Sequence, residues 1–178
     1  MKNKAVFLDR DGTLNKVILR NGKPFPPRDF KDFEILAGVK DAIDLFESQG
    51  YIPIVITNQP DFARGTSTLE QIDSLNNMVR EKLNIKHIYT CLHDDQDDCL
   101  CRKPKPGLLV QAAHELNIEL TASIMIGDRW RDIQAGQIVG CSCYYIDCNY
   151  MEPQPQQPFE RVLSLFDAAK KVGSIHDI

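Results

Sequence analysis

Apolar runs alternate with helical patterns along this chain, and no other feature limits its possible folds as strongly. Apolar runs of about four to eight residues are typical of buried strands, and apolar residues at i, i+3, i+4 and i+7 are typical of amphipathic helices. Strands that alternate with helices form a parallel sheet covered on both faces. We therefore predict an α/β fold, a three-layer, doubly wound, Rossmann-like parallel sheet. The predicted strands are residues 5–8, 51–56, 85–90, 123–126 and 141–146.

Capping residues and breakers indicate where the helices begin. Ser67 and Glu70 have the spacing of a capping box ahead of an amphipathic stretch. Pro106 fits the first turn of the next long helix, because proline lacks the N–H that this turn leaves unpaired. We predict a last helix over residues 159–172, after the Pro/Gln-rich connector 152–158.

Length and charge restrict the class of protein. The 178 residues have the size of one domain, so we expect residues 1–178 to fold as a single unit. The formal net charge of -4 argues against a nucleic-acid binder that relies on bulk positive charge. No apolar run approaches the roughly 18 residues of a membrane span, and the first residues lead into a strand. We expect a cytoplasmic monomer with no nucleic-acid or membrane partner.

The carboxyl ends of the predicted strands carry the polar residues of interest. Asp9 and Asp11 follow the first strand, where residues i and i+2 point to the same side. Gly12 then allows a sharp turn close to a ligand. Thr57 ends the second strand and Asp128 follows the fourth. Each residue alone has an ordinary interpretation as a surface acid or a cap, but ligands of open parallel sheets gather at this edge.

Together these residues indicate phosphate-ester hydrolysis with a divalent cation. Asp9 is the candidate nucleophile, which would form an aspartyl phosphate. Asp11 would protonate the leaving alkoxide and then activate water. Asp9 and Asp128 would hold Mg²⁺ through hard oxygen ligands. Thr57 would donate a hydrogen bond to the transferring phosphoryl group, and Lys103 would place positive charge against its oxygens.

Three thiols and an imidazole lie in two tight pairs within residues 91–101. Four N/S ligands in such pairs indicate a closed, structural zinc site, and the alternative is a set of reduced loop cysteines. Arg102 and Lys103 follow immediately, so zinc would also fix two basic side chains that meet the substrate. We interpret the acids at the loop tip as a solvated turn. The predicted Zn²⁺ ligands are Cys91, His93, Cys99 and Cys101.

Other features carry less information. Cys141 and Cys143 share one face of the last predicted strand and are interpreted as small apolar core residues, whereas Cys148 has no assigned role. The basic segment 16–31 suits an anionic partner, and Asn21-Gly22 within it predicts a hairpin tip.

These residues resemble the four motifs of the haloacid dehalogenase (HAD) superfamily of phosphohydrolases. The motif residues are Asp9-x-Asp11-Gly12-Thr13, Thr57, Lys103 and Gly127-Asp128. The chain is also similar to small, capless bacterial phosphatases that include D-glycero-D-manno-heptose 1,7-bisphosphate phosphatase and histidinol-phosphate phosphatase. The finer likeness lies in Thr57-Asn58-Gln59, Ala63-Arg64-Gly65, Arg102-Lys103-Pro104 and Gly127-Asp128-Arg129.

The resemblance implies a capless fold, a substrate and a set of ligands. It implies that Mg²⁺ binds the side chains of Asp9 and Asp128 and the main-chain carbonyl of Asp11. The implied substrate is heptose 1,7-bisphosphate, from which the enzyme would remove the 7-phosphate. The alternative substrate is histidinol phosphate or another small sugar phosphate. The residues implied to line the substrate pocket are Asn58, Gln59, Arg102 and Arg129.

Two other classes share parts of this pattern. A signalling receiver domain would carry its phosphate-accepting aspartate at the end of a middle strand, where this chain has Thr57. A phosphatase of DNA 3′ ends shares the motifs at 9–13 and 57–59, but the chain has neither an aromatic stacking platform nor a long basic stripe. Rapid phosphate release would favour the enzyme, and a long-lived phosphoryl group the receiver.

Overall fold

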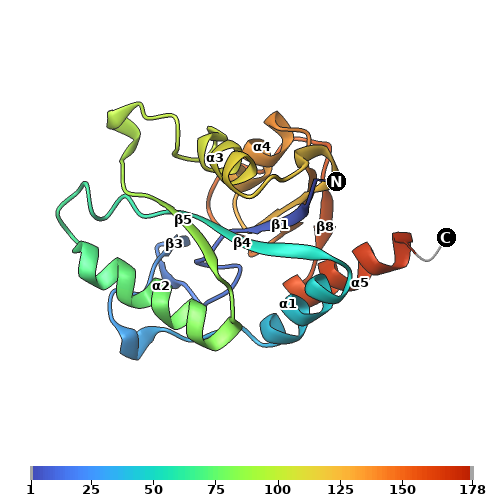
Figure 1. Ribbon diagram of the computed structural model, residues 1–178. Helices are drawn as coiled ribbons and strands as arrows, with labels where there is room; N and C mark the ends of the chain where they lie inside the picture. Colours follow the sequence, from blue (N-terminus) through green and yellow to red (C-terminus); the bar gives the residue numbers. More distant parts are fainter. Residues whose placement is uncertain (1, 177–178) are drawn as a thin grey trace.

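The computed structural model describes residues 2–176, and its centre is a six-stranded sheet (Figure 1). The strand order is β5-β4-β1-β6-β7-β8, and every neighbouring pair is parallel. The parallel sheet predicted from the alternating pattern is therefore confirmed. The strands are β1 (Lys4–Leu8), β4 (Tyr51–Asn58), β5 (His87–Cys91), β6 (Ile124–Gly127), β7 (Ser142–Ile146) and β8 (Glu160–Val162).

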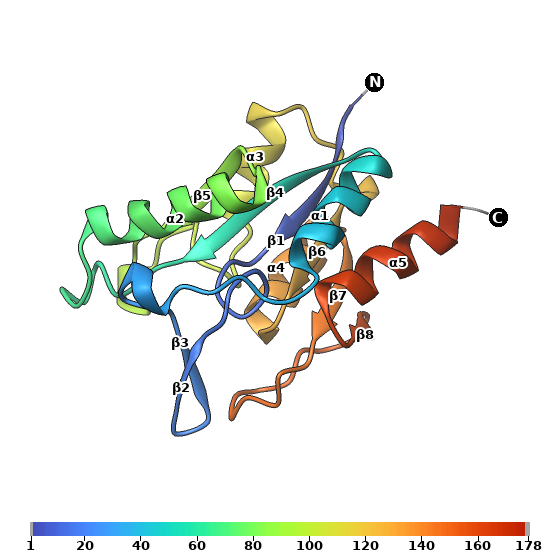
Figure 2. The ribbon, with the colours of Figure 1, turned by 90° about the horizontal axis from the view of Figure 1, so that it is seen from below.

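Helices cover both faces of this sheet, as Figures 1 and 2 show. On β1, Val6 and Leu8 pack in one apolar core with α1, α2 and α5, whereas Ala5 and Phe7 pack in a second core with α3 and α4. The period of two along a strand thus supplies both cores, and the three-layer, doubly wound prediction is confirmed. The helices are α1 (Val39–Ser48), α2 (Leu69–Leu83), α3 (Gly107–Glu115), α4 (Trp130–Ile138) and α5 (Leu165–His176).

The strand order reverses at β1, which determines where a ligand can bind. From β1 the chain runs outward through β4 and β5, returns to β6 on the other side of β1, and continues to β7 and β8. Open α/β sheets bind ligands at such a switch point, outside the carboxyl ends of the strands. Asp9 follows β1 and Asp128 follows β6, so both lie at this point.

Two helix starts differ from their predictions by one residue. The capping box of α2 is made by Thr68 and Gln71 instead of Ser67 and Glu70: the Gln71 N–H donates to Thr68 Oγ1 over 3.2 Å, and the Thr68 N–H donates to Gln71 Oε1 over 2.9 Å. Both pairs have the i, i+3 spacing, so the sequence pattern alone did not distinguish them. Pro106 is the N-cap of α3 and not part of its first turn.

The predicted last helix over residues 159–172 is wrong at its start. The chain first forms β8, which adds a parallel strand beside β7, and α5 begins only at Leu165. Phe159 packs edge-on against Tyr145 with ring centroids 5.6 Å apart, and Val162 is buried in the core. A strand of three residues is too short to show alternation, so its apolar residues read as part of a helical pattern.

A hairpin of β2 (Ile18–Arg20) and β3 (Lys23–Phe25) lies between β1 and α1. Asn21 and Gly22 at its tip have φ of 50° and 71°, as a two-residue hairpin turn of this kind requires, so the predicted tip is confirmed. The hairpin projects beside the loop 147–158 (Figure 2), and the Met151 N–H donates to Gly22 O over 2.8 Å.

The hairpin and a 3-10 turn, η1 (Phe30–Asp32), are the elements between β1 and α1, so within the described residues no further folded layer caps this edge of the sheet. Across residues 2–176, none of the helices combines the length and the apolar character that crossing a bilayer requires.

Candidate active site

A cleft of about 200 Å³ opens at the carboxyl edge of the sheet, between the hairpin, the segment 91–103 and the start of α4. The strand-end acids form its base and arginines form much of its wall. Thr57 and Gln59 do not belong to the lining, since they are 1% and 2% exposed and lie beneath it. The predicted site residues that do line the cleft are Asp9, Asp11, Asn58, Arg102, Lys103 and Arg129.

Lys103 is buried at the base of the cleft and joins two acids. Its Nζ lies 2.7 Å from Asp9 Oδ1 and 2.7 Å from Asp132 Oδ1, and it also donates to the Ile56 carbonyl over 2.6 Å. Burial lowers the pKa of Lys103, but the charges of Asp132 and Asp9 outweigh this effect and raise it above its usual value. The side chain therefore carries a fixed positive charge beside Asp9, where the strand-end pattern predicted a basic group.

Asp9, Asp128 and Asp132 form a carboxylate cluster, each with an oxygen within 4.8 Å of the others. Burial, opposed by Lys103 and aided by Asp132, raises the pKa of Asp9 to about 6. Burial and the charge of Asp9 raise the pKa of Asp128 well above its usual range. Asp128 Oδ2 is buried with no hydrogen-bond partner, although the Tyr150 hydroxyl lies near it. Clustered carboxylates with an unpaired buried oxygen are a donor set that fits Mg²⁺.

Sequence reasoning missed Asp132, which lies in the first turn of α4. Its Oδ2 accepts the Arg129 N–H over 3.0 Å, and its Oδ1 pairs with Lys103. A side chain at Gly127 would overlap Asp132, so glycine allows β6 and α4 to approach this closely. The signal available in the sequence was the i, i+4 spacing from Asp128, which brings both acids to one helix end.

Asp11 is held by donors from three directions and is not part of the carboxylate cluster. Gln59 Nε2 donates to its Oδ2 over 2.7 Å, Asn15 Nδ2 donates to its Oδ1 over 3.0 Å, and Arg10 donates to both oxygens. Arg10 is itself fully buried and reaches Asn76 on α2 over 2.8 Å. Sequence reasoning missed Arg10, because nothing in the local pattern indicates its distant partner.

The residues after Thr57 support the acids and Lys103 from below. Gln59 was expected to line the substrate pocket, but it lies behind Asp11, and its amide also donates to Thr57 Oγ1 over 2.9 Å. Asn58 does reach the cleft, yet its amide is used by the main chain of Lys103, accepting from N over 3.1 Å and donating to O over 3.0 Å. Both amides therefore position charged groups.

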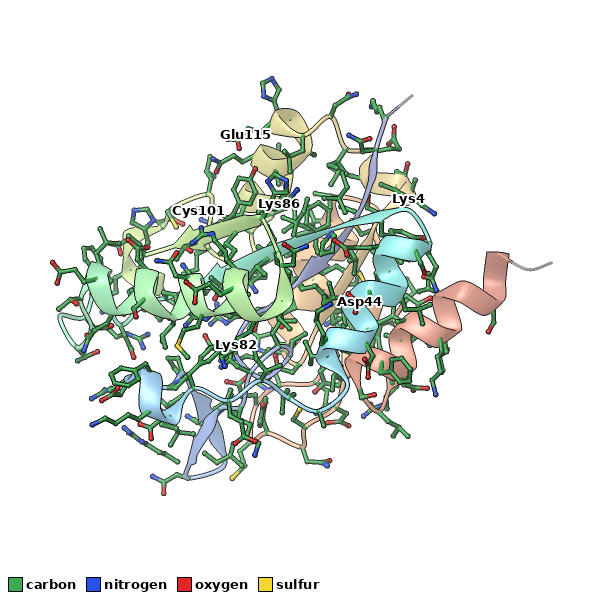
Figure 3. The ribbon with its side chains drawn as sticks, turned by 60° about the horizontal axis from the view of Figure 1, so that its bottom comes forward. Lys4, Asp44, Lys82, Lys86, Cys101 and Glu115 are labelled. Carbon is green, nitrogen blue, oxygen red and sulfur yellow. The ribbon has the colours of Figure 1, made fainter. Side chains whose placement is uncertain are left out.

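The four predicted zinc ligands meet in the loop after β5. Their ligand atoms lie within 4.8 Å of one another, and the Cys91–Cys99 and Cys91–Cys101 sulfurs are 3.8 and 3.2 Å apart. Four ligands on bonds of about 2.3 Å would be about 3.8 Å apart in a tetrahedron, so the set fits Zn²⁺. Figure 3 shows Cys101 in this loop, beside β5 and far from Asp44 on α1.

The other cysteines lie elsewhere. None of the six cysteines of the chain forms a disulfide bond. Cys141 and Cys143 are buried in the core between the sheet and helices α3 and α4, in agreement with their interpretation as small apolar residues. Cys148 is half-buried against the other apolar core.

Two acids at the tip of the zinc loop pair with arginines of the cleft, which the prediction of a solvated turn did not include, whereas Asp97 and Asp98 are exposed as that prediction expected. Asp94 accepts two hydrogen bonds from Arg64, at 2.7 and 2.6 Å, which lower its pKa to about 2. Asp95 accepts from Arg102 Nε over 2.8 Å. On the opposite wall, Arg129 donates from Nε to Glu152 over 2.8 Å.

The pKa of Asp9 predicts how pH affects the metal-free protein. The carboxyl titrates at 3.8 in the reference state and at about 6 when folded, so the folded protein binds more protons between these values. The stability from protonated Asp9 is fully present below pH 3.8 and is lost as pH rises through about 6. We expect the unfolding free energy in chelator to rise by a few kcal/mol on acidification from pH 7 to 4, at about 1.4 kcal/mol per pKa unit.

An Asp128→Asn variant tests the cause of this dependence. Removing one carboxylate from the cluster should make the pH dependence shallower and stabilise the chelated protein at pH 7. With excess Mg²⁺ the wild type should gain stability and the variant should not. Denaturant unfolding from pH 4 to 8, with and without metal, measures both effects, and an equal pH dependence in the two proteins would contradict the explanation.

Comparison with known proteins adds sequence and fold relationships to this geometry. The family model of haloacid dehalogenase-like hydrolases matches residues 28–140. A D-glycero-beta-D-manno-heptose-1,7-bisphosphate 7-phosphatase from Haemophilus influenzae is 38% identical over 145 residues, which cover 75% of this chain and 76% of that protein. An enzyme of the same name from Helicobacter pylori is 40% identical over 140 residues, which cover 75% of this chain and 78% of that protein.

A solved structure shares the fold over nearly the whole chain. The D,D-heptose 1,7-bisphosphate phosphatase from B. bronchiseptica, complexed with magnesium and phosphate, matches with a TM-score of 0.84. The match covers 97% of this chain and 99% of that one, at 22% identity.

Proposed function

Since the chain belongs to the haloacid dehalogenase-like hydrolase family and is a phosphatase, we propose that it removes the 7-phosphate of D-glycero-D-manno-heptose 1,7-bisphosphate. The reaction leaves a sugar 1-phosphate and inorganic phosphate. The single observation that best supports this function is Asp9 at the base of a cleft, 2.7 Å from a buried lysine and beside two further carboxylates, below a wall rich in arginine.

Asp9 is the proposed nucleophile. An oxygen of its carboxylate attacks phosphorus, the bond to the sugar oxygen breaks, and an aspartyl phosphate forms. Lys103 places a compact positive charge against the phosphoryl oxygens, and it is held there by Asp132 and the Ile56 carbonyl. Thr57 Oγ1, just beneath the cleft lining, accepts from Gln59, so its own hydroxyl proton stays free for the proposed bond to a phosphoryl oxygen at the base of the cleft.

Asp11 is the proposed acid and base. It gives a proton to the departing sugar oxygen and later takes one from the water that hydrolyses the aspartyl phosphate. Gln59, Asn15 and Arg10 restrict the orientation of the Asp11 side chain. Less conformational entropy is therefore lost when its carboxyl group meets the substrate.

The metal ions complete the proposal. Asp9 and Asp128, with the main-chain carbonyl of Asp11, would hold Mg²⁺, which when bound neutralises charge on the phosphoryl group. Asp132 lies close enough to support the same ion. Zn²⁺ would be structural and fix the loop that carries Arg102 and Lys103.

Substrate preference provides the test. Initial rates with Mg²⁺ should be measured on heptose 1,7-bisphosphate, histidinol phosphate and fructose 1,6-bisphosphate. We expect kcat/KM for the heptose bisphosphate to exceed the others by at least about tenfold, because a hydrogen-bonding site rejects partners that leave its polar groups unpaired. A higher value for histidinol phosphate would favour the alternative substrate and overturn this one.

We extend the proposal to the setting of the enzyme. Six free thiols agree with a reducing compartment, so we infer that the protein acts in the cytoplasm. We also infer that residues 1–178 form one domain that is active as a monomer on small phosphorylated sugars, without nucleic acid. Sedimentation of the active enzyme and activity that is insensitive to added DNA would support this.

A further inference from the structure

Charge is segregated within the cleft. The base is acidic, with Asp9 and Asp132 paired to Lys103 and with Asp11 also in the lining, which suits a cation and the reacting phosphate. The outer wall is richer in basic than in acidic side chains, which suits a second anionic group farther out on the substrate. The basic residues of this outer wall are Lys23, Arg64, Arg102, Arg129 and Arg131.

Two of these arginines share one carboxylate oxygen. Asp95 Oδ1 accepts from Arg102 Nε over 2.8 Å and from Arg131 Nη1 over 3.1 Å. Asp95 belongs to the zinc loop and Arg131 to α4, so the oxygen connects elements from the two sides of the cleft. Two guanidinium groups repel each other, and the shared carboxylate allows them to lie this close together.

Arg131 is also held on its other side. Its guanidinium carbon lies 4.8 Å from the centroid of the Trp130 ring, a cation–π contact. Asp95 uses only Nη1 of Arg131, and no other hydrogen bond of Arg131 is formed within the described residues, so Nε and Nη2 remain available as donors. A planar guanidinium with two unused donors in a cleft is suited to bind a phosphate through two bonds.

From this geometry we propose that Arg131 is a specificity-determining residue that, together with Arg102, clamps the second phosphate of the substrate. Asp95 is a positioning residue that holds the two guanidinium groups at a fixed distance from each other. This inference rests on the proposed function, because it requires a substrate with two phosphates. It adds to the motif residues a side chain that none of the sequence patterns indicated.

A purely structural ion pair predicts different behaviour. Exposed pairs contribute little to stability, and 54% of the Asp95 side chain is exposed. Removing such a pair would change kcat and KM for all substrates equally or for none of them. A clamp on the second phosphate would change only the substrates that carry it.

The test compares a sugar bisphosphate with the matched sugar phosphate that lacks the 1-phosphate. For Arg131→Gln we expect KM for the bisphosphate to rise by about tenfold or more with kcat unchanged, and both constants for the monophosphate to stay within about twofold. Arg131→Lys should recover part of the loss, because it restores charge but not the two-bond geometry. Arg80→Gln removes the same charge from the exposed face of α2 and should leave kcat and KM for both substrates unchanged.

Asp95→Asn tests the positioning role. It should raise KM for the bisphosphate, and its effect should not add to that of Arg131→Gln if the two residues act as a unit. A lower KM would show that Asp95 competes with the phosphate, and would overturn its positioning role. The Ki of the sugar 1-phosphate product gives a second measurement, since this product keeps the clamped phosphate and should inhibit Arg131→Gln less strongly.

The remaining outcomes separate this inference from the proposed function. If the wild type prefers the bisphosphate and Arg131→Gln keeps that preference, the clamp is wrong and the function stands. If Arg131→Gln lowers activity on both substrates equally, the role of Arg131 is general and the clamp is overturned. If the wild type does not distinguish the two substrates, both proposals fail.

Discussion

An Asp9→Asn protein is expected to lose phosphate-ester hydrolysis by at least about 10⁴-fold, the scale of loss when a hydrolase loses its nucleophile. An amide oxygen does not attack phosphorus, and the variant also loses one proposed metal ligand. The fold should persist, because Lys103 keeps its contacts with Asp132 and the Ile56 carbonyl. Removing one charge from three clustered carboxylates should leave the metal-free protein at least as stable as the wild type.

The experiment is pre-steady-state release of the aryl alcohol from an activated aryl phosphate, with circular dichroism as a check on folding. Asp11→Asn is the matched control, because it makes the same chemical change two residues away. With a leaving group that needs no proton, Asp11→Asn should show one burst and then stall as an aspartyl phosphate. Asp9→Asn should show no burst. Normal turnover by Asp9→Asn would remove the basis of the proposed function.

Loss of zinc is expected to have the second largest effect. We predict that Cys91→Ser lowers both stability and substrate affinity. Zinc binding contributes about 10–16 kcal/mol in small peptides, which is comparable with a domain stability of about 5–15 kcal/mol. The site is also connected to the base of the cleft, since Cys91 ends β5 and its carbonyl accepts the Gln59 N–H over 2.7 Å. Arg102 follows the ligand Cys101 directly, so a loosened loop should raise KM more than it lowers kcat.

Cys148→Ser is the matched control for this prediction, because it removes a half-buried thiol that lies outside the proposed zinc site. Metal analysis should find one zinc per chain in the wild type and in Cys148→Ser, but not in Cys91→Ser. Thermal unfolding and the separate kcat and KM values complete the measurement. A wild-type protein that contains no zinc and is fully active would contradict the assignment.

The fold was predictable because periodicity is a local signal. A short apolar run rich in β-branched residues, such as residues 51–56, favours a buried strand, and once the strands were placed, their ends brought Asp9, Thr57 and Asp128 to one edge. β8 was missed because three residues at a sheet edge carry no period. The Thr68 cap was missed because its neighbour offers the same chemistry at the same spacing.

The partners of the site residues were less predictable. Arg10 pairs with Asn76, and Asp95 with Arg131, across long stretches of sequence. A charged residue in a motif does not reveal which distant side chain satisfies it, because that depends on how the strands and loops are placed. The ion pairs that Asp94 and Asp95 of the zinc loop form with arginines were missed for the same reason.

The contact between the hairpin tip and the loop 147–158 affects how this cleft could be altered. The main chain of Met151 bonds to Gly22, and the next residue, Glu152, holds Arg129. A side chain at Gly22 would collide with Met151, so the tip and the loop fit each other as one wall. Grafting a hairpin from a relative with another substrate would therefore disturb Arg129 through this loop, and a working chimera would have to exchange both segments together.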